Sequence, residues 1–99
     1  MIKELSKYQM KNGQLYLIDM YASWCEPCKT QSQILDRLLD EDKRVEILKI
    51  DVESDMSLTS ELNIMGVPSL LFVRNKKVLW KKPGVLKKEE LKKVIDELY

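Results

Sequence analysis

The sequence predicts an α/β fold, in which a central mixed sheet of about five strands is flanked by about four helices. Short runs of apolar and β-branched residues alternate with segments whose apolar residues recur at helical spacing, and two such runs near the end follow each other directly, as in a hairpin. Strands that alternate with helices favour a sheet with helices on its faces. A chain of 99 residues, 44% hydrophobic and 33% charged, is the size of one domain. We therefore expect a single domain over residues 1–99.

The N-terminal elements have the weakest patterns. Residues 1–5 are expected to form a short strand, and Ser6 to cap one or two helical turns that end at residues 12–13, an Asn-Gly pair. Residues 15–22 are apolar on both faces except for Asp19. This pattern is typical of a strand that is covered on both sides.

The middle of the chain continues the alternation. Residues 26–40 are predicted to form a helix, because their leucines and isoleucine recur at helical spacing among polar residues. Residues 45–52 are rich in β-branched side chains and are expected to form the next strand. A short helix over residues 54–63 should follow, with Ser54 or Asp55 as its cap.

The C-terminal part is predicted to contain a hairpin and a helix. Residues 69–73 and 77–81 form the two arms of the hairpin around residues 75–76. A Pro-Gly pair at 83–84 then breaks the chain, and residues 87–99 have one apolar face, as an amphipathic helix would.

Composition excludes several kinds of function. The formal net charge of +1 gives no general attraction to nucleic acid or to acidic partners. The chain has no histidine, the commonest general base and metal ligand. It shows no apolar signal segment at its start and no run near the roughly 20 apolar residues of a membrane span. We therefore expect a cytoplasmic monomer that binds neither nucleic acid nor membranes.

Both cysteines, Cys25 and Cys28, lie in one stretch, WCEPCK at residues 24–29. A purely structural disulfide is a weak explanation, because it would close a very short loop worth about 2 kcal/mol and because such disulfides are uncommon in the cytosol. A zinc site is also weak, because it needs four Cys or His ligands and this chain would have to borrow two from a second copy.

Redox chemistry fits the local sequence better. Cys25 lies just before the predicted helix and Cys28 one turn inside it, where free backbone N–H groups and the helix dipole favour a thiolate. The thiolate is the attacking species in disulfide exchange. We therefore expect Cys25 to be the exposed nucleophile and Cys28 to resolve the mixed disulfide, while Pro27 stiffens the turn between them and suits the first turn of the helix.

Residues 19–29, DMYASWCEPCK, resemble the active-site segment of the thioredoxin family, whose usual form is D-F-W-A-x-W-C-G-P-C-K. Residues 65–69, MGVPS, resemble the G-[IV]-P-T loop of that family, and they follow at the expected distance. Lys49 and Gly84 also fall where thioredoxins carry a lysine and a glycine. The resemblance covers nearly the whole chain.

The resemblance implies a thiol–disulfide oxidoreductase with the thioredoxin fold that reduces disulfides in other proteins. Cys25 would attack and Cys28 would resolve. Asp19 would be a buried carboxylate that helps to move the Cys28 proton, with Lys49 nearby to tune it. The family needs no bound cofactor and no metal, and its members are re-reduced by a thioredoxin reductase, which can be linked to NADPH or to ferredoxin.

The resemblance also implies where substrates bind. Pro68 would be cis and would pack its loop against the cysteines, the Val67 backbone would pair with an extended substrate segment, and Trp24 would shield the sulfurs. The substrate-binding residues expected in this way are Trp24, Glu26, Pro27, Gly66, Val67, Pro68 and Gly84.

Asp19 can also be judged from physical chemistry alone. It interrupts an apolar strand, and burial of a carboxylate raises its pKa toward neutrality, where it could act as a general base in a chain without histidine. The alternative is an Asp at a position on the sheet that water reaches. The residues alone leave both open, and the resemblance favours the first.

The sequence departs from the family pattern at Glu26, where thioredoxins usually have glycine. Its carboxylate suits a helix N-terminus but opposes a thiolate at Cys25, so our hypothesis is that Glu26 shifts the reduction potential. Lysines and arginine crowd the last third of the chain. A solvated surface explains them better than a docking patch for an acidic partner such as a reductase.

Two other functions stay open at this point. The same dithiol could work as an oxidant or an isomerase if its reduced form is stabilised. The fold could instead be a binding module in which the thiols are incidental. Glutaredoxin is a poorer match, because its proline directly follows the first cysteine, whereas here Glu26 does.

Overall fold

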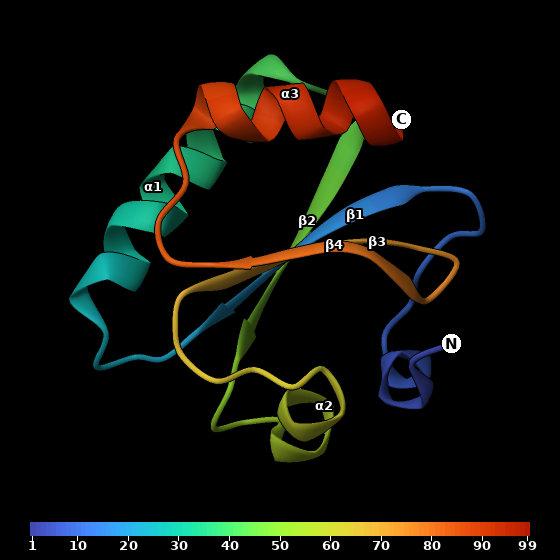
Figure 1. Ribbon diagram of the computed structural model, residues 1–99, viewed down its shortest axis with the longest axis vertical. Helices are drawn as coiled ribbons and strands as arrows, with labels where there is room; N and C mark the ends of the chain where they lie inside the picture. The colour runs from blue at the N-terminus through green and yellow to red at the C-terminus, as the bar shows by residue number, and fades with distance from the viewer.

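A four-stranded mixed sheet lies in the middle of the molecule (Figure 1). The computed structural model describes residues 1–99. The strands are β1 (Leu15–Tyr21), β2 (Val45–Asp51), β3 (Ser69–Arg74) and β4 (Lys77–Pro83); the α-helices are α1 (Glu26–Glu41), α2 (Met56–Glu61) and α3 (Lys88–Leu98); and η1 (Lys3–Lys7) is a 3-10 helix. The strand order is β2-β1-β3-β4, with β1 and β2 parallel and β3 antiparallel to both of its neighbours.

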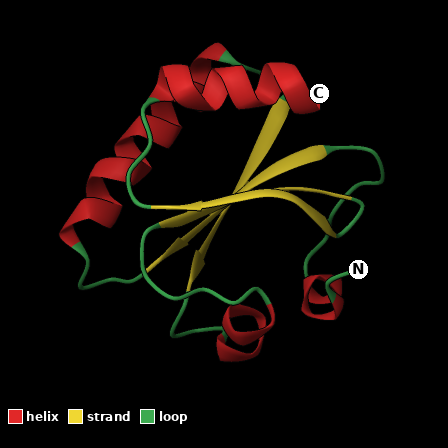
Figure 2. Cartoon of the chain, in the orientation of Figure 1, coloured by secondary structure: helices red, strands yellow, loops and turns green.

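Helices cover both faces of this sheet (Figure 2). On one face, Leu15 and Leu17 of β1 pack in a cluster with apolar residues of α1 and α3. On the other, Ile18 and Met20 pack in a cluster with residues of α2 and η1. Successive side chains of a strand point to opposite faces, so Asp19 belongs to the face that α1 and α3 cover.

The predicted mixed sheet between helices is confirmed, but it has four strands, so the prediction of about five was wrong. Residues 1–5 do not form a strand. The backbone N–H groups of Lys3 and Glu4 donate to the carboxylate of Glu61, at 3.0 and 2.8 Å, and η1 begins there. This carboxylate lies at the end of α2, and it satisfies the donors that a strand would have given to a neighbour. The predicted helical turns from Ser6 to residues 12–13 were also wrong, since η1 ends at Lys7.

The hairpin is confirmed, with its turn at Asn75 and Lys76. Both residues have positive φ, 52° and 62°, as a two-residue hairpin turn of the primed type requires. Asn tolerates this backbone conformation better than most residues. Its side-chain oxygen also accepts a hydrogen bond from Gly13 N–H at 2.8 Å, which ties the start of β1 to the hairpin.

Helix α1 is joined to its surroundings at two levels. Gln31 is fully buried, and its side chain exchanges two hydrogen bonds with the backbone of Leu86, Leu86 N–H to Gln31 Oε1 at 2.7 Å and Gln31 Nε2 to Leu86 O at 3.1 Å. At the far end of the helix, Glu41 pairs with Lys88 and Lys92 of α3. Two lysines of the basic C-terminal third therefore bind within the chain.

None of the helices has the length and apolar character needed to cross a membrane.

Candidate active site

The two cysteines form a disulfide at the point where β1 leads into α1. Cys25 is the N-cap of α1, and Pro27 lies in the first turn. The backbone N–H of Cys28 donates to Cys25 Sγ at 3.2 Å. This donor would stabilise negative charge on the Cys25 sulfur once the disulfide is reduced, and so would the N-terminal end of the helix dipole.

The expectation that Cys25 is exposed was wrong for this oxidised form. Cys25 is 4% exposed and Cys28 is 3% exposed, so both are nearly covered. The covering side chains come from segments far apart in the sequence: Tyr21, Ala22, Val52 and Val67. Exposure of the whole residue therefore does not distinguish the two thiols, whereas their positions on the helix do.

The loop before β3 packs against the disulfide. Val67 contacts the cluster that holds both cysteines, and the Val67–Pro68 peptide bond is cis, as the resemblance implied. Gly84 N–H donates to Pro68 O at 2.8 Å, and Ser69 Oγ donates to Gly66 O at 2.7 Å. Val67 thus lies against the cysteines, and Gly84 is bound to the same loop through Pro68.

Asp19 is buried in β1, on the sheet face that α1 and α3 cover, with 1% of its surface exposed. Neither of its carboxylate oxygens has a hydrogen-bond partner. Burial raises the pKa of Asp19 from 3.8 to about 6, and the positive charge of Lys49 opposes part of that rise. Of the two possibilities left open by the sequence, the structure has the buried carboxylate.

Lys49 lies beside Asp19 in the sheet, because the two residues are partners in the register of β1 and β2. Its ammonium group, however, binds helix α1. Lys49 Nζ donates to Ser32 Oγ at 2.7 Å and to Asp36 Oδ1 at 2.8 Å. Lys49, Ser32 and Cys28 all line a pocket of about 340 Å³.

Trp24 and Glu26, which flank Cys25 in the sequence, lie at the surface. Glu26 forms an ion pair with Lys29, one helical turn later, at 2.7 Å. Trp24 is 68% exposed, and its indole N–H points to Glu53 Oε2 at 3.4 Å. Its expected role of shielding the sulfurs stays a prediction. No group of three or more His, Cys, Asp or Glu side chains is arranged as metal ligands would be.

Comparison with known proteins gives this arrangement a family. A family model described as thioredoxin matches residues 3–97. The chain belongs to the thioredoxin family. The thioredoxin of Staphylococcus haemolyticus is 34% identical over 82 residues, which are 82% of this chain and 79% of that protein. The thioredoxin of Buchnera aphidicola is 33% identical over 89 residues, 89% of this chain and 82% of that one.

A solved structure agrees with the family. Thioredoxin-2 of the malaria parasite superposes with a TM-score of 0.83 at 27% identity, covering 90% of this chain and 86% of that one. The predicted thioredoxin fold is therefore confirmed. This thioredoxin-family protein is a thiol–disulfide oxidoreductase of the protein-disulfide reductase type, and it works through the dithiol of Cys25 and Cys28.

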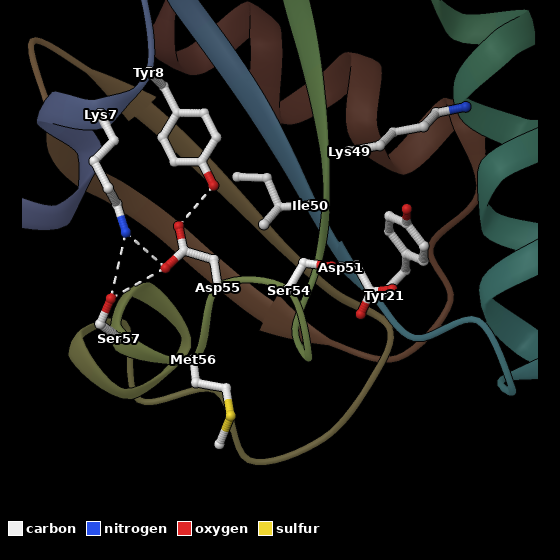
Figure 3. A pocket seen from close by; sticks show the side chains of 10 residues that line it. All are labelled: Lys7, Tyr8, Tyr21, Lys49, Ile50, Asp51, Ser54, Asp55, Met56 and Ser57. Carbon is white, nitrogen blue, oxygen red and sulfur yellow. Dashed lines mark hydrogen bonds and ion pairs between the residues drawn. The ribbon is translucent and has the colours of Figure 1, made fainter.

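A second pocket, of about 620 Å³, lies between η1, α2 and the end of the sheet (Figure 3). Two of its polar side chains bind a third: Tyr8 OH donates to Asp55 Oδ2 at 2.7 Å, and Lys7 Nζ donates to Asp55 Oδ1 at 2.8 Å. Burial, together with the hydrogen bond to Asp55, raises the pKa of Tyr8 to about 12. The bond from Lys7 holds the pKa of Asp55 well below its usual range. This group joins η1 to α2 and contains no thiol.

Ser32 and Asp36, which bind Lys49, were not predicted from the sequence as neighbours of the site. A signal was present, because Cys28, Ser32 and Asp36 follow one another at intervals of four residues and therefore lie along one face of α1. What the sequence did not show is that Lys49, on a strand, would reach this face.

Proposed function

We propose that the protein reduces disulfides in other proteins and that the residues of its site divide the work as follows. The observation that supports this best is the disulfide at the N-terminus of α1, with the loop of Val67 and Pro68 packed against it. In the reduced protein, the Cys25 thiolate attacks one sulfur of the substrate disulfide. A mixed disulfide forms, and the other substrate sulfur leaves as a thiolate.

The second step needs a proton acceptor. Cys28 loses its proton, and its thiolate attacks Cys25 Sγ, so the protein disulfide forms and the second substrate thiolate leaves. Two electrons have then passed from the protein to the substrate. Asp19 is the proposed acceptor, directly or through one water, because its carboxylate has a pKa of about 6 and no partner holds it.

Substrate is proposed to bind across the loop beside the disulfide. An extended segment would pair with the Val67 backbone, as one strand pairs with another. Pro68, Gly66 and Gly84 give this surface its shape, and Trp24 and the start of α1, with Glu26 and Pro27, form its other side. Lys49 is proposed to tune Asp19.

The partners are proposed from the family and from composition. They are proteins with disulfides and a thioredoxin reductase, which the dithiol could meet in either its NADPH-linked or its ferredoxin-linked form. We propose a single-domain, cytoplasmic monomer that binds no nucleic acid, since the net charge is only +1.

The test is the reduction potential of the Cys25–Cys28 pair. The protein is equilibrated in buffers of defined thiol–disulfide ratio, and tryptophan fluorescence reports the redox state. A two-electron transition well below the cytosolic glutathione poise, roughly −220 to −260 mV, supports a reductant. A potential near or above that poise would make the protein an oxidant or isomerase. The double variant Cys25→Ser, Cys28→Ser is the control, and a biological role that survives in it would indicate a binding module.

A further inference from the structure

Lys49 and Asp19 are placed as if to form an ion pair. They are register partners on adjacent parallel strands, so both side chains leave the same face of the sheet, the one that α1 covers. Asp19 is buried and its oxygens have no partner. A buried carboxylate with a lysine beside it would ordinarily take that lysine as its partner, because an unpaired charge is costly to bury.

The lysine binds elsewhere. Its Nζ donates to Ser32 Oγ at 2.7 Å and to Asp36 Oδ1 at 2.8 Å. Figure 3 shows its side chain running from β2 toward α1, away from the group around Asp55. Ser32 and Asp36 are four residues apart and so present their oxygens on one face of the helix. Two oxygens at these distances fix the position of a flexible ammonium group.

We propose that Asp36 is a positioning residue: together with Ser32 it holds the Lys49 ammonium group on α1 and keeps it from pairing with the Asp19 carboxylate. The importance of this arrangement for catalysis rests on the proposed role of Asp19. A carboxylate in direct contact with an ammonium group stays ionised at lower pH, and it would be a weaker base for the Cys28 proton.

Among the charged and polar groups near Lys49, Asp36 is the carboxylate that forms an ion pair with the Lys49 ammonium group. On α1, Cys28 and Lys29 line the pocket that Lys49 also lines, and Lys29 is already paired with Glu26. Tyr21 of β1 and Asp51 of β2 line another pocket together with Lys49. The Asp51 carboxylate accepts a hydrogen bond from Glu53 N–H. On β3 the register partner of Asp19 is Leu70, which carries no charge. Neither Tyr21 nor Asp51 forms a hydrogen bond or ion pair with Lys49.

The variant Asp36→Asn tests the proposal, and it should fold. The Asp36 side chain is 67% exposed, and exposed ion pairs contribute little to stability. The measurement is the titration of the Asp19 carboxyl carbon by ¹³C NMR in the oxidised protein, which needs no substrate. We expect the pKa of Asp19 to fall by on the order of 1 unit, as Lys49 is released toward it. Asp40→Asn removes a charge of the same sign from another exposed position of the same helix, and it should leave this titration unchanged.

Repeating the substitution in a Lys49→Met protein distinguishes a positioning role of Asp36 from a direct effect of its negative charge on Asp19. In a Lys49→Met protein, Asp36→Asn has no ammonium group to release and should not move the titration of Asp19. An equal shift in both backgrounds would overturn the proposal, because Asp36 would then act through its own field. An unchanged or raised pKa in Asp36→Asn alone would overturn it too.

The pH profile of disulfide exchange distinguishes this proposal from the proposed function. The rate at which the reduced protein reduces a substrate disulfide is measured against pH for the parent protein and Asp36→Asn. If the Asp19 titration and the rate profile move together, both proposals are supported. If the titration moves while the profile stays, Asp36 still positions Lys49, and it is the role of Asp19 as proton acceptor that fails.

Discussion

Asp19 and Lys49 are register partners on β1 and β2, yet no hydrogen bond or ion pair joins their side chains. The lysine is bound to Asp36, and the carboxylate is left buried and unpaired. Such a group lowers the stability of the fold, since burial penalises its charged form. We propose that the group is kept for proton transfer at the Cys25–Cys28 dithiol, since perturbed carboxylates of this kind occur at functional sites.

The first prediction concerns stability and pH in the variant Asp19→Asn. The unfolded carboxyl titrates near 3.8 and the folded one near 6, so the folded state binds more protons between these values and loses stability as the pH rises through them. The loss is complete above the folded pKa and amounts to about 3 kcal/mol. Asn does not titrate. The free energy of unfolding of Asp19→Asn minus that of the parent should therefore increase by about 3 kcal/mol from pH 3 to pH 8, measured by urea unfolding.

The control for this measurement is Asp40→Asn, which changes an exposed carboxylate on α1. Its difference from the parent protein should stay nearly constant over the same range. A constant difference for Asp19→Asn as well would mean that the Asp19 carboxyl titrates alike in the folded and unfolded chains. Burial of this carboxyl would then not make the stability depend on pH.

The second prediction concerns Glu26. Replacing it with Gln removes a negative charge beside Cys25, which favours the thiolate, stabilises the reduced dithiol and raises the reduction potential. The side chain is exposed and paired with Lys29, so the shift should be small, roughly 10 to 20 mV. Lys29→Gln is the matched variant and should lower the potential, because it leaves the Glu26 charge uncompensated. Potentials that move in the same direction in both variants would contradict this account.

Much of the fold followed from patterns within short windows of sequence. The helix from Glu26 was predicted because its apolar residues recur at helical spacing, and Pro27 in its first turn agreed with that start. The predicted strand around Asp19 and the hairpin around Asn75 also formed, since alternation and turn chemistry are local properties. The CxxC pair at a helix N-terminus could be read in the same way, and it carried most of the functional prediction.

The errors lie where distant residues decide the structure. The first residues became η1 because Glu61, far along the chain, binds their backbone N–H groups. Cys25 belongs to a buried cluster against which Val52 and Val67 pack from other segments. Lys49 could be placed beside Asp19 by resemblance, but its choice of Asp36 depends on how α1 lies over β2. No local pattern in the sequence contains that information.

The third prediction concerns Gln31, whose role sequence reasoning did not find. In Gln31→Ala, the buried N–H and C=O of Leu86 both lose their partner, and each unsatisfied group costs about 1 to 3 kcal/mol. We expect a loss of about 3 kcal/mol in the free energy of unfolding, measured with urea. The control is Gln33→Ala, two positions further along the same helix and exposed, which should cost about 0.5 kcal/mol or less. Equal costs for the two would mean that the bonds to Leu86 are replaced by water.

The last prediction concerns Asp55, which binds α2 and η1 at once. Its Oδ1 accepts the N–H of Leu58 at 3.1 Å and caps α2, and its Oδ2 accepts the Tyr8 hydroxyl at 2.7 Å. Asp55→Ala should cost about 2 kcal/mol and speed amide hydrogen exchange in α2 more than in α1. Tyr8→Phe removes only the second bond and should cost less.

Because the folded pKa of Asp55 is lowered, the stability that Asp55 contributes is present above the unfolded pKa near 3.8 and is lost as the pH falls through the folded value. Exchange in α2 that is as slow in Asp55→Ala as in the parent protein would show that the cap and the tie to η1 do not hold this helix.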